Sequence, residues 1–170
     1  ICYINRTLET AVIAYVIMTI HELFHLIAAK IIGLKAANIT FQPFGLNLKL
    51  KNRYIYSTAE EIVLYLAGPF ANILMAAVCV ICMKFGGQSA NEYVQYFYMY
   101  NILLFAANML PILPLDGGII LKKLLMYKLG MKKAVFIMRS ITCFFIGLIS
   151  LFTVYTINYE GANYSLICMV

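Results

Sequence analysis

Residues 11–29 read AVIAYVIMTIHELFHLIAA, an apolar run that contains both histidines of the chain. About 20 consecutive apolar residues are enough for a helix to cross the hydrocarbon core of a membrane. On such a helix His21 and His25 lie on one face, four residues apart, and can bind the same metal ion. Glu22 is placed to act as a general base toward a water that the metal activates. The run therefore predicts a metal site at membrane depth, where ionisable residues usually mark function.

The composition is that of a membrane protein. Hydrophobic residues make up 64% of the 170 positions, charged residues 12%, and the mean hydropathy is +0.87. A soluble domain usually carries about 25% charged residues. The length allows about four spans of about 20 residues, which predicts a single membrane-embedded domain over residues 1–170. The net charge of +6 arises from short connections between spans, so nucleic-acid binding is not predicted.

The hydrophobic pattern predicts an all-α polytopic membrane protein, a bundle of about four to five transmembrane helices. After the third span, Pro111, Pro114, Gly117 and Gly118 occur at membrane depth. Such a sequence indicates a broken helix, which is tolerated only inside protein or beside a water-filled cavity. The chain is expected to be truncated at both ends, because 164–170 resembles the start of a further span. The four expected spans are 8–32, 59–83, 93–110 and 134–157.

The segment between the first two spans has a different pattern. Leu46, Leu48 and Leu50 alternate with the polar residues Asn47 and Lys49, and this period of two is typical of a strand. The preceding Pro-Phe-Gly at 43–45 indicates a turn or an edge strand. We therefore predict a short β-hairpin here, although a plain loop that happens to alternate stays open.

The basic residues predict the orientation of the chain. Eleven of the thirteen lie in or near the two connections that follow the first and third expected spans. Positive charge concentrates on the cytoplasmic side of membrane proteins, so both connections, and the HELFH and Asp116 segments near them, should face the cytoplasm. The eleven are Lys30, Lys35, Lys49, Lys51, Arg53, Lys122, Lys123, Lys128, Lys132, Lys133 and Arg139.

Catalytic zinc usually takes three protein ligands, and two histidines leave the site one short. Asp116 is the best candidate because it is the only aspartate in the chain and precedes two glycines that permit close backbone approach. Glu60 and Glu61 are alternatives, but they stand at a helix start, where the helix dipole favours negative charge.

Other interpretations of these residues stay open. HELFH could be a buried polar cluster, or part of an ion or proton relay in a transporter that also uses Asp116. Gly68 and Pro69 could serve helix packing or contact a substrate. Asn108 could make an interhelical hydrogen bond or steady a transition state. The cysteines Cys79 and Cys82 have CxxC spacing, but they lie in an apolar run without a zinc-knuckle loop.

Three motifs occur in order: HELFH at 21–25, AGPFAN at 67–72 and NMLPILPLDGG at 108–118. They resemble the motifs of the site-2 protease family of intramembrane metalloproteases, peptidase family M50, and the third has the form found in its stage IV sporulation protein FB subgroup. The resemblance covers residues 8–125. It implies one zinc ion per chain, with His21, His25 and Asp116 as ligands and Glu22 as the acid/base. Many members of the subgroup carry a C-terminal CBS domain, and none is recognised in these 170 residues.

The resemblance also implies a substrate class. Such a protease cuts a transmembrane or membrane-associated protein within or near its membrane segment. A pro-sigma factor processed during sporulation is the first expectation, with an anti-sigma factor or a remnant signal peptide as alternatives. We expect inhibitory membrane-protein partners and a multi-pass location in the lipid bilayer. An inactive relative that only binds membrane proteins is a further alternative, against which the intact Glu22 and candidate ligands argue.

The residues also suggest how a substrate is held. The strand at Leu46, Asn47 and Leu48 could bind it in an extended form by β-addition. Asn108 could donate to the oxyanion, and Gly68 and Pro69 are further candidate contacts.

Overall fold

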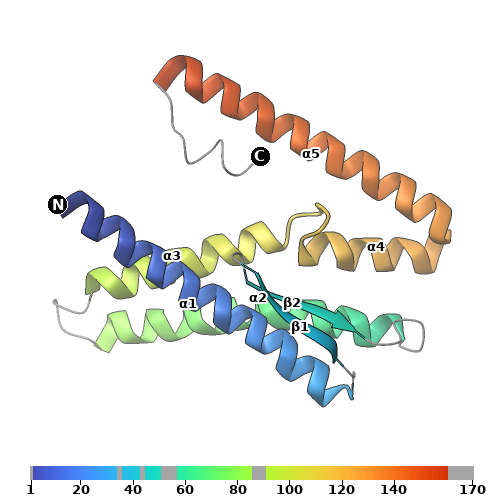
Figure 1. The fold of residues 1–170 in the computed structure, drawn as a ribbon, viewed down its shortest axis with the longest axis horizontal. Helices are drawn as coiled ribbons and strands as arrows, with labels where there is room; N and C mark the ends of the chain where they lie inside the picture. The colour runs from blue at the N-terminus through green and yellow to red at the C-terminus, as the bar shows by residue number, and fades with distance from the viewer. Residues whose placement is uncertain (1, 34–35, 43–44, 51–56, 86–90, 161–170) are drawn as a thin grey trace. The chain divides into compact units, whose positions relative to one another are not determined.

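The computed structural model describes residues 2–33, 36–42, 45–50, 57–85 and 91–160 (Figure 1). The chain divides into two compact units, Ile1–Leu110 and Pro111–Val170, and the expectation of one domain stays a prediction. The described residues form helices α1 (Cys2–Ile31), α2 (Thr58–Phe85), α3 (Asn91–Asn108), α4 (Asp116–Leu129) and α5 (Met131–Glu160), and strands β1 (Ala36–Gln42) and β2 (Gly45–Leu50).

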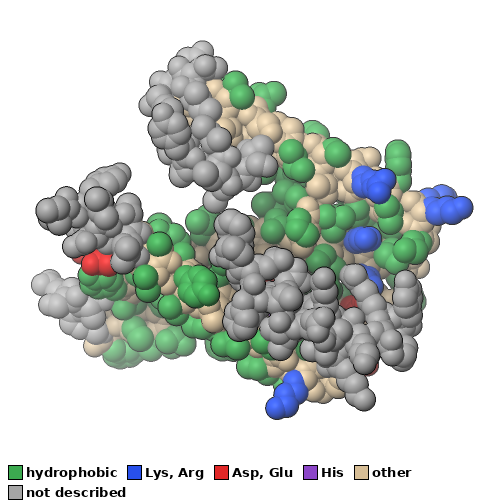
Figure 2. Space-filling view, in the orientation of Figure 1, with side chains coloured by type: hydrophobic (Ala, Val, Ile, Leu, Met, Phe, Trp, Pro, Cys, Tyr) green, Lys and Arg blue, Asp and Glu red, His purple; other side chains and the backbone are tan. Residues whose placement is uncertain are grey.

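Three of the described helices are long and apolar enough to cross a membrane. These segments are Glu9–Ile31, Thr58–Phe85 and Met131–Thr156, and they coincide with the first, second and fourth expected spans. Large apolar side chains are exposed along all three, and apolar side chains occupy much of the described surface on the face shown in Figure 2. Lipid rather than water is the favourable environment for such surfaces.

The third expected span differs from the prediction. Helix α3 is regular over its 18 residues, but it is not among the described helices that are apolar enough to cross a membrane. Four tyrosines, Gln95 and Asn101 lower its hydropathy. Of the four expected spans, the first, second and fourth are therefore supported by helices of sufficient length and hydropathy.

The first unit is a packing of α2 against α1 and α3 (Figure 1). The buried side chains of α2 include the small residues Gly68, Ala71 and Ala76. Small residues allow helix backbones to approach closely where no hydrophobic effect draws the helices together. Pro69 lies inside α2 without ending it, so α2 presents one continuous face to α1.

Local signals set the ends of these helices. Ser57 and Glu60 form a capping box: the Glu60 amide donates to Ser57 Oγ (3.2 Å), and the Ser57 amide donates to Glu60 Oε2 (2.8 Å). At the end of α1, Gly33 adopts a positive φ of 78°. Its amide donates to the Lys30 carbonyl oxygen, which ends the helix where Gly33 predicts.

The alternating segment is strand β2, which pairs antiparallel with β1. Leu46, Asn47 and Leu48 lie opposite Phe41, Thr40 and Ile39. Strand β2 also contacts α1, the helix that carries the histidines. The expected turn at residues 43–44 lies outside the described residues, as do the 86–90 loop and the 164–170 run.

The second unit begins with non-helical backbone. Between the end of α3 at Asn108 and the start of α4 at Asp116 no described residue is helical, as the prolines and glycines predict. The Leu113 amide donates to Thr142 Oγ1 on α5 (3.2 Å), and a Cβ at Gly118 would overlap the Ile112 carbonyl. The glycine therefore lets α4 begin directly against this loop.

Candidate metal centre

His21 and His25 face each other on α1. Their Nε2 atoms are 3.1 Å apart, and the ring planes meet at 80°. Both side chains are buried, with 3% and 8% of their surface exposed. The four-residue spacing thus places two imidazole nitrogens side by side, as the sequence predicts.

The space beside these two nitrogens is bounded by Gly68 of α2. A Cβ at this position would overlap Nε2 of both His21 and His25. Tetrahedral zinc, with Zn–N bonds of about 2.0–2.1 Å, holds two nitrogen ligands about 3.3 Å apart. The two imidazoles and the space that the glycine leaves therefore fit a zinc ion.

The outward nitrogens of both imidazoles contact α2. His25 Nδ1 lies 2.8 Å from the Leu64 carbonyl oxygen. A carbonyl can only accept, so the His25 proton is on Nδ1 and its Nε2 carries the lone pair that a metal requires. His21 Nδ1 lies 3.1 Å from the side-chain amide of Asn72. Both contacts orient the rings from behind, as the outer partners of metal-binding histidines do.

The α2 groups that face the histidines are Leu64, Gly68 and Asn72, at steps of four residues. This spacing puts them on one face of the helix. Leu64 and Asn72 are site residues that were not predicted from the sequence. The spacing of Gly68 and Asn72 within AGPFAN is the signal that could have connected Asn72 with the glycine.

The remaining predicted residues lie in several places. Glu22 follows His21 on α1 and is half-buried. Asp116 is the first residue of α4, in the second unit, and is buried. Asn108, the last residue of α3, donates from Nδ2 to the Leu104 carbonyl oxygen (3.1 Å), so this bond is intrahelical rather than interhelical.

The two alternative ligands, Glu60 and Glu61, both lie in the first turn of α2. Glu60 belongs to the capping box of α2. Glu61 is buried near the start of the same helix. Cys79 is buried whereas Cys82 is exposed, so the two thiols lie in different environments. The capping box gives Glu60 a structural role at the start of α2.

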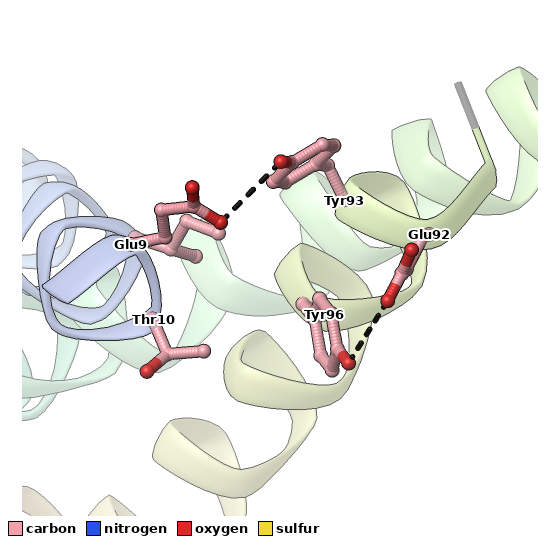
Figure 3. A pocket seen from close by; sticks show the side chains of 6 residues that line it. Glu9, Thr10, Glu92, Tyr93 and Tyr96 are labelled. Carbon is pink, nitrogen blue, oxygen red and sulfur yellow. Dashed lines mark hydrogen bonds between the residues drawn. The ribbon is translucent and has the colours of Figure 1, made fainter. Parts of the chain in front are cut away.

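A pocket in the first unit is separate from the histidines. It is lined by Glu9, Thr10 and Ile13 of α1 and by Glu92, Tyr93 and Tyr96 of α3 (Figure 3). The Tyr93 hydroxyl donates to Glu9, and the Tyr96 hydroxyl donates to Glu92, both at 3.3 Å. Glu9 precedes His21 by twelve residues, about 18 Å along the helix at about 1.5 Å per residue. The pocket is therefore not part of the metal centre.

Known proteins are similar to this chain in sequence. The chain is 28% identical over 132 residues to Zinc metalloprotease MJ0392 of Methanocaldococcus jannaschii, covering 76% of this chain and 38% of the relative. It is 30% identical over 125 residues to Stage IV sporulation protein FB of Bacillus subtilis, covering 69% of this chain and 41% of the relative. The chain thus spans about two fifths of the length of these curated relatives.

A solved structure and a family model agree with these relatives. The Site-2 Protease from Methanocaldococcus jannaschii matches with a TM-score of 0.72 and 26% identity, over 92% of this chain and 69% of that structure. The model of peptidase family M50 matches residues 9–90 and 84–151. The chain therefore belongs to peptidase family M50, the site-2 proteases, as its three motifs lead us to expect.

Proposed function

We propose that this chain is an intramembrane zinc metalloprotease domain that cuts a membrane-associated protein within or near its transmembrane segment. The observation that carries the proposal is the pair of buried Nε2 atoms of His21 and His25, 3.1 Å apart beside Gly68. A helix long and apolar enough to cross a membrane carries this pair. Membership of peptidase family M50 supplies the reaction class.

His21, His25 and Asp116 would hold one zinc ion per chain. Two imidazole nitrogens and a carboxylate oxygen are a ligand set of catalytic zinc sites, with the fourth position left to water or substrate. Asp116 is the only aspartate in the chain. It is the first residue of α4 and follows the proline-containing, non-helical residues 109–115.

The chemistry of the proposed reaction is peptide hydrolysis. Zinc, when bound, supplies a Lewis acid that polarises the scissile carbonyl and acidifies the attacking water. Glu22 accepts the proton of that water and passes it to the nitrogen of the leaving amine. His21 and His25 are buried, and electrostatic interactions are stronger in buried surroundings than in water.

Strand β2 and Asn108 are the proposed substrate contacts. In the sheet of β1 and β2 each strand keeps one edge that the other does not pair, and β2 lies against α1. Leu46, Asn47 and Leu48 could therefore hold an unwound substrate segment by β-addition. Asn108 keeps one amide proton beyond its bond to Leu104 and could donate it to the oxyanion. Gly68 acts by leaving room beside the histidines, and Pro69 beside it is buried.

We propose a multi-pass location with the active site toward the cytoplasm. The argument is the concentration of positive charge before α2 and after α3. If α2 crosses the membrane, the two connections lie on one side only if α3 crosses it as well. The substrate proposal is a pro-sigma factor processed during sporulation, because one relative is Stage IV sporulation protein FB. An anti-sigma factor or a remnant signal peptide is the alternative substrate, and inhibitory membrane proteins are the proposed partners.

The test is cleavage of a membrane-inserted substrate by purified protein. Glu22→Gln removes the base but keeps the size of the side chain, so the rate should fall by about 10²- to 10⁴-fold while bound zinc stays at the wild-type level. Glu9→Gln, on the same helix but in the separate pocket, is the matched control and should keep the full rate. Full activity of the Glu22 variant would show that Glu22 is not the general base. A protein that folds but neither binds zinc nor cleaves would favour the relay of a transporter.

A further inference from the structure

Asn72 is one of two described asparagines whose side chains are fully buried. The other is Asn101 of α3, and both have 0% of their surface exposed. Each places its side-chain nitrogen near an acceptor but leaves Oδ1 buried without a hydrogen-bond partner. Buried amide oxygens without partners are rare in proteins. Asn101 Nδ2 faces a backbone carbonyl, whereas Asn72 Nδ2 faces a ring nitrogen of His21.

The nitrogen and the oxygen of the Asn72 carboxamide require different tautomers of His21. If Nδ2 donates to His21 Nδ1, the imidazole proton must be on Nε2, and that nitrogen cannot bind a metal. Rotation of the carboxamide by 180° exchanges the two ends with almost no change in shape. Oδ1 then accepts a hydrogen bond from Nδ1–H, and Nε2 of His21 carries a lone pair. The rotation also gives the buried oxygen a partner.

His25 already has this arrangement, because the Leu64 carbonyl can only accept from its Nδ1. A metal ion needs the same tautomer in both histidines. We propose that Asn72 is a positioning residue for the metal centre, whose side-chain oxygen holds His21 as the Nδ1–H tautomer and so presents Nε2 to the metal. This inference rests on the proposed function, and it assigns α2 the outer partners of both histidines: Leu64 for His25 and Asn72 for His21.

The test is the zinc dissociation constant of the purified chain, measured by competition with a chelator. Asn72→Leu keeps the branched shape of the side chain but removes the acceptor, so the dissociation constant should rise by about 10- to 100-fold, as when an outer partner of a metal-binding histidine is lost. Asn72→Asp supplies only acceptors and should bind zinc at least as tightly as the wild type. Asn101→Leu removes an equally buried asparagine that does not contact a histidine, and its dissociation constant should be unchanged.

Several outcomes would overturn the inference. A wild-type dissociation constant for Asn72→Leu would show that the acceptor has no role. Zinc binding by Asn72→Asp as weak as that of Asn72→Leu would show that the amide nitrogen, and not the oxygen, serves His21. If Asn72→Leu does not fold, Asn72→Ala takes its place, and the aspartate variant still decides which end of the amide is used. Absence of zinc from the folded wild type would instead refute the proposed function, and the role of Asn72 with it.

A second readout uses the fact that the chain has two histidines only. With ¹⁵N-labelled histidine, the zinc-bound protein gives signals from two imidazoles. Both should show a protonated Nδ1, and the His21 Nδ1–H signal should shift in Asn72→Asp but not in Asn101→Leu. A protonated Nε2 on His21 would contradict the assignment.

Discussion

Gly68 is the residue whose small size matters most to the proposed site. A methyl group at this position would occupy the space between Nε2 of His21 and Nε2 of His25. We therefore predict that Gly68→Ala lowers zinc affinity at least as far as loss of an outer partner would, about 10- to 100-fold. The helix itself should tolerate the change, because alanine is the better helix former. Zinc titration and thermal unfolding of the variant measure the two effects separately.

Gly147 provides the matched control for this substitution. It also lies inside a membrane-length helix, α5, but a Cβ there meets no atom within 4 Å. Gly147→Ala should therefore leave zinc affinity unchanged and should not lower stability. Equal zinc affinity in Gly68→Ala and Gly147→Ala would show that the space beside Gly68 is not where the metal binds.

At this scale the sequence predicts the ligand types but not their surroundings. The i, i+4 spacing is enough to pair His21 with His25, because helix geometry fixes it. The approach of Leu64, Gly68 and Asn72 depends on how α2 packs against α1, and no local pattern specifies that packing. The two interpretations of Gly68, helix packing and a role at the site, are compatible. The glycine lets α2 pack closely against α1, and its missing side chain leaves the space beside the histidines.

Helix α2 begins with a capping box that can be tested as an element. Ser57→Ala removes the acceptor for the Glu60 amide and should lower the free energy of unfolding by about 0.5–2 kcal/mol. Ser140→Ala is the control, because Ser140 Oγ donates only to the Phe136 carbonyl of its own helix. Thermal unfolding in one detergent compares the two. Equal midpoints would show that the box does not stabilise α2.

The helices differ in how well the sequence predicts them. Long apolar runs predict α1, α2 and α5 well, because their length and hydropathy leave few alternatives. The sequence predicts a broken helix around Asp116 but not the extent of α4 to Leu129, because the lysines of this segment make it look like a connection between spans. The Ser-x-x-Glu pattern at 57–60 was available as a capping signal, whereas the sequence analysis explained Glu60 by the helix dipole alone.

The whole chain has an orientation that depends on α3. Its tyrosines and polar residues make it less apolar than the three candidate spans, yet the proposed topology requires it to cross. We predict that Ser57→Cys and Lys132→Cys, each in a variant lacking the native cysteines, react with an impermeant thiol reagent only from the cytoplasmic side. Glu92→Cys should react only from the opposite side. Labelling of Ser57→Cys and Lys132→Cys from opposite sides would mean that α3 does not cross.

The claim on which the whole account depends is that His21, His25 and Asp116 bind one zinc ion. The most direct measurement is the zinc content of the purified, folded chain, determined with Asp116→Ala and Glu61→Ala beside the wild type. Wild type and Glu61→Ala should contain one zinc per chain, because Glu61 is not a proposed ligand. Asp116→Ala should lose most of its zinc after dialysis against a chelator that leaves the wild type loaded. A folded wild type without zinc, or an Asp116 variant that retains it fully, would contradict the account.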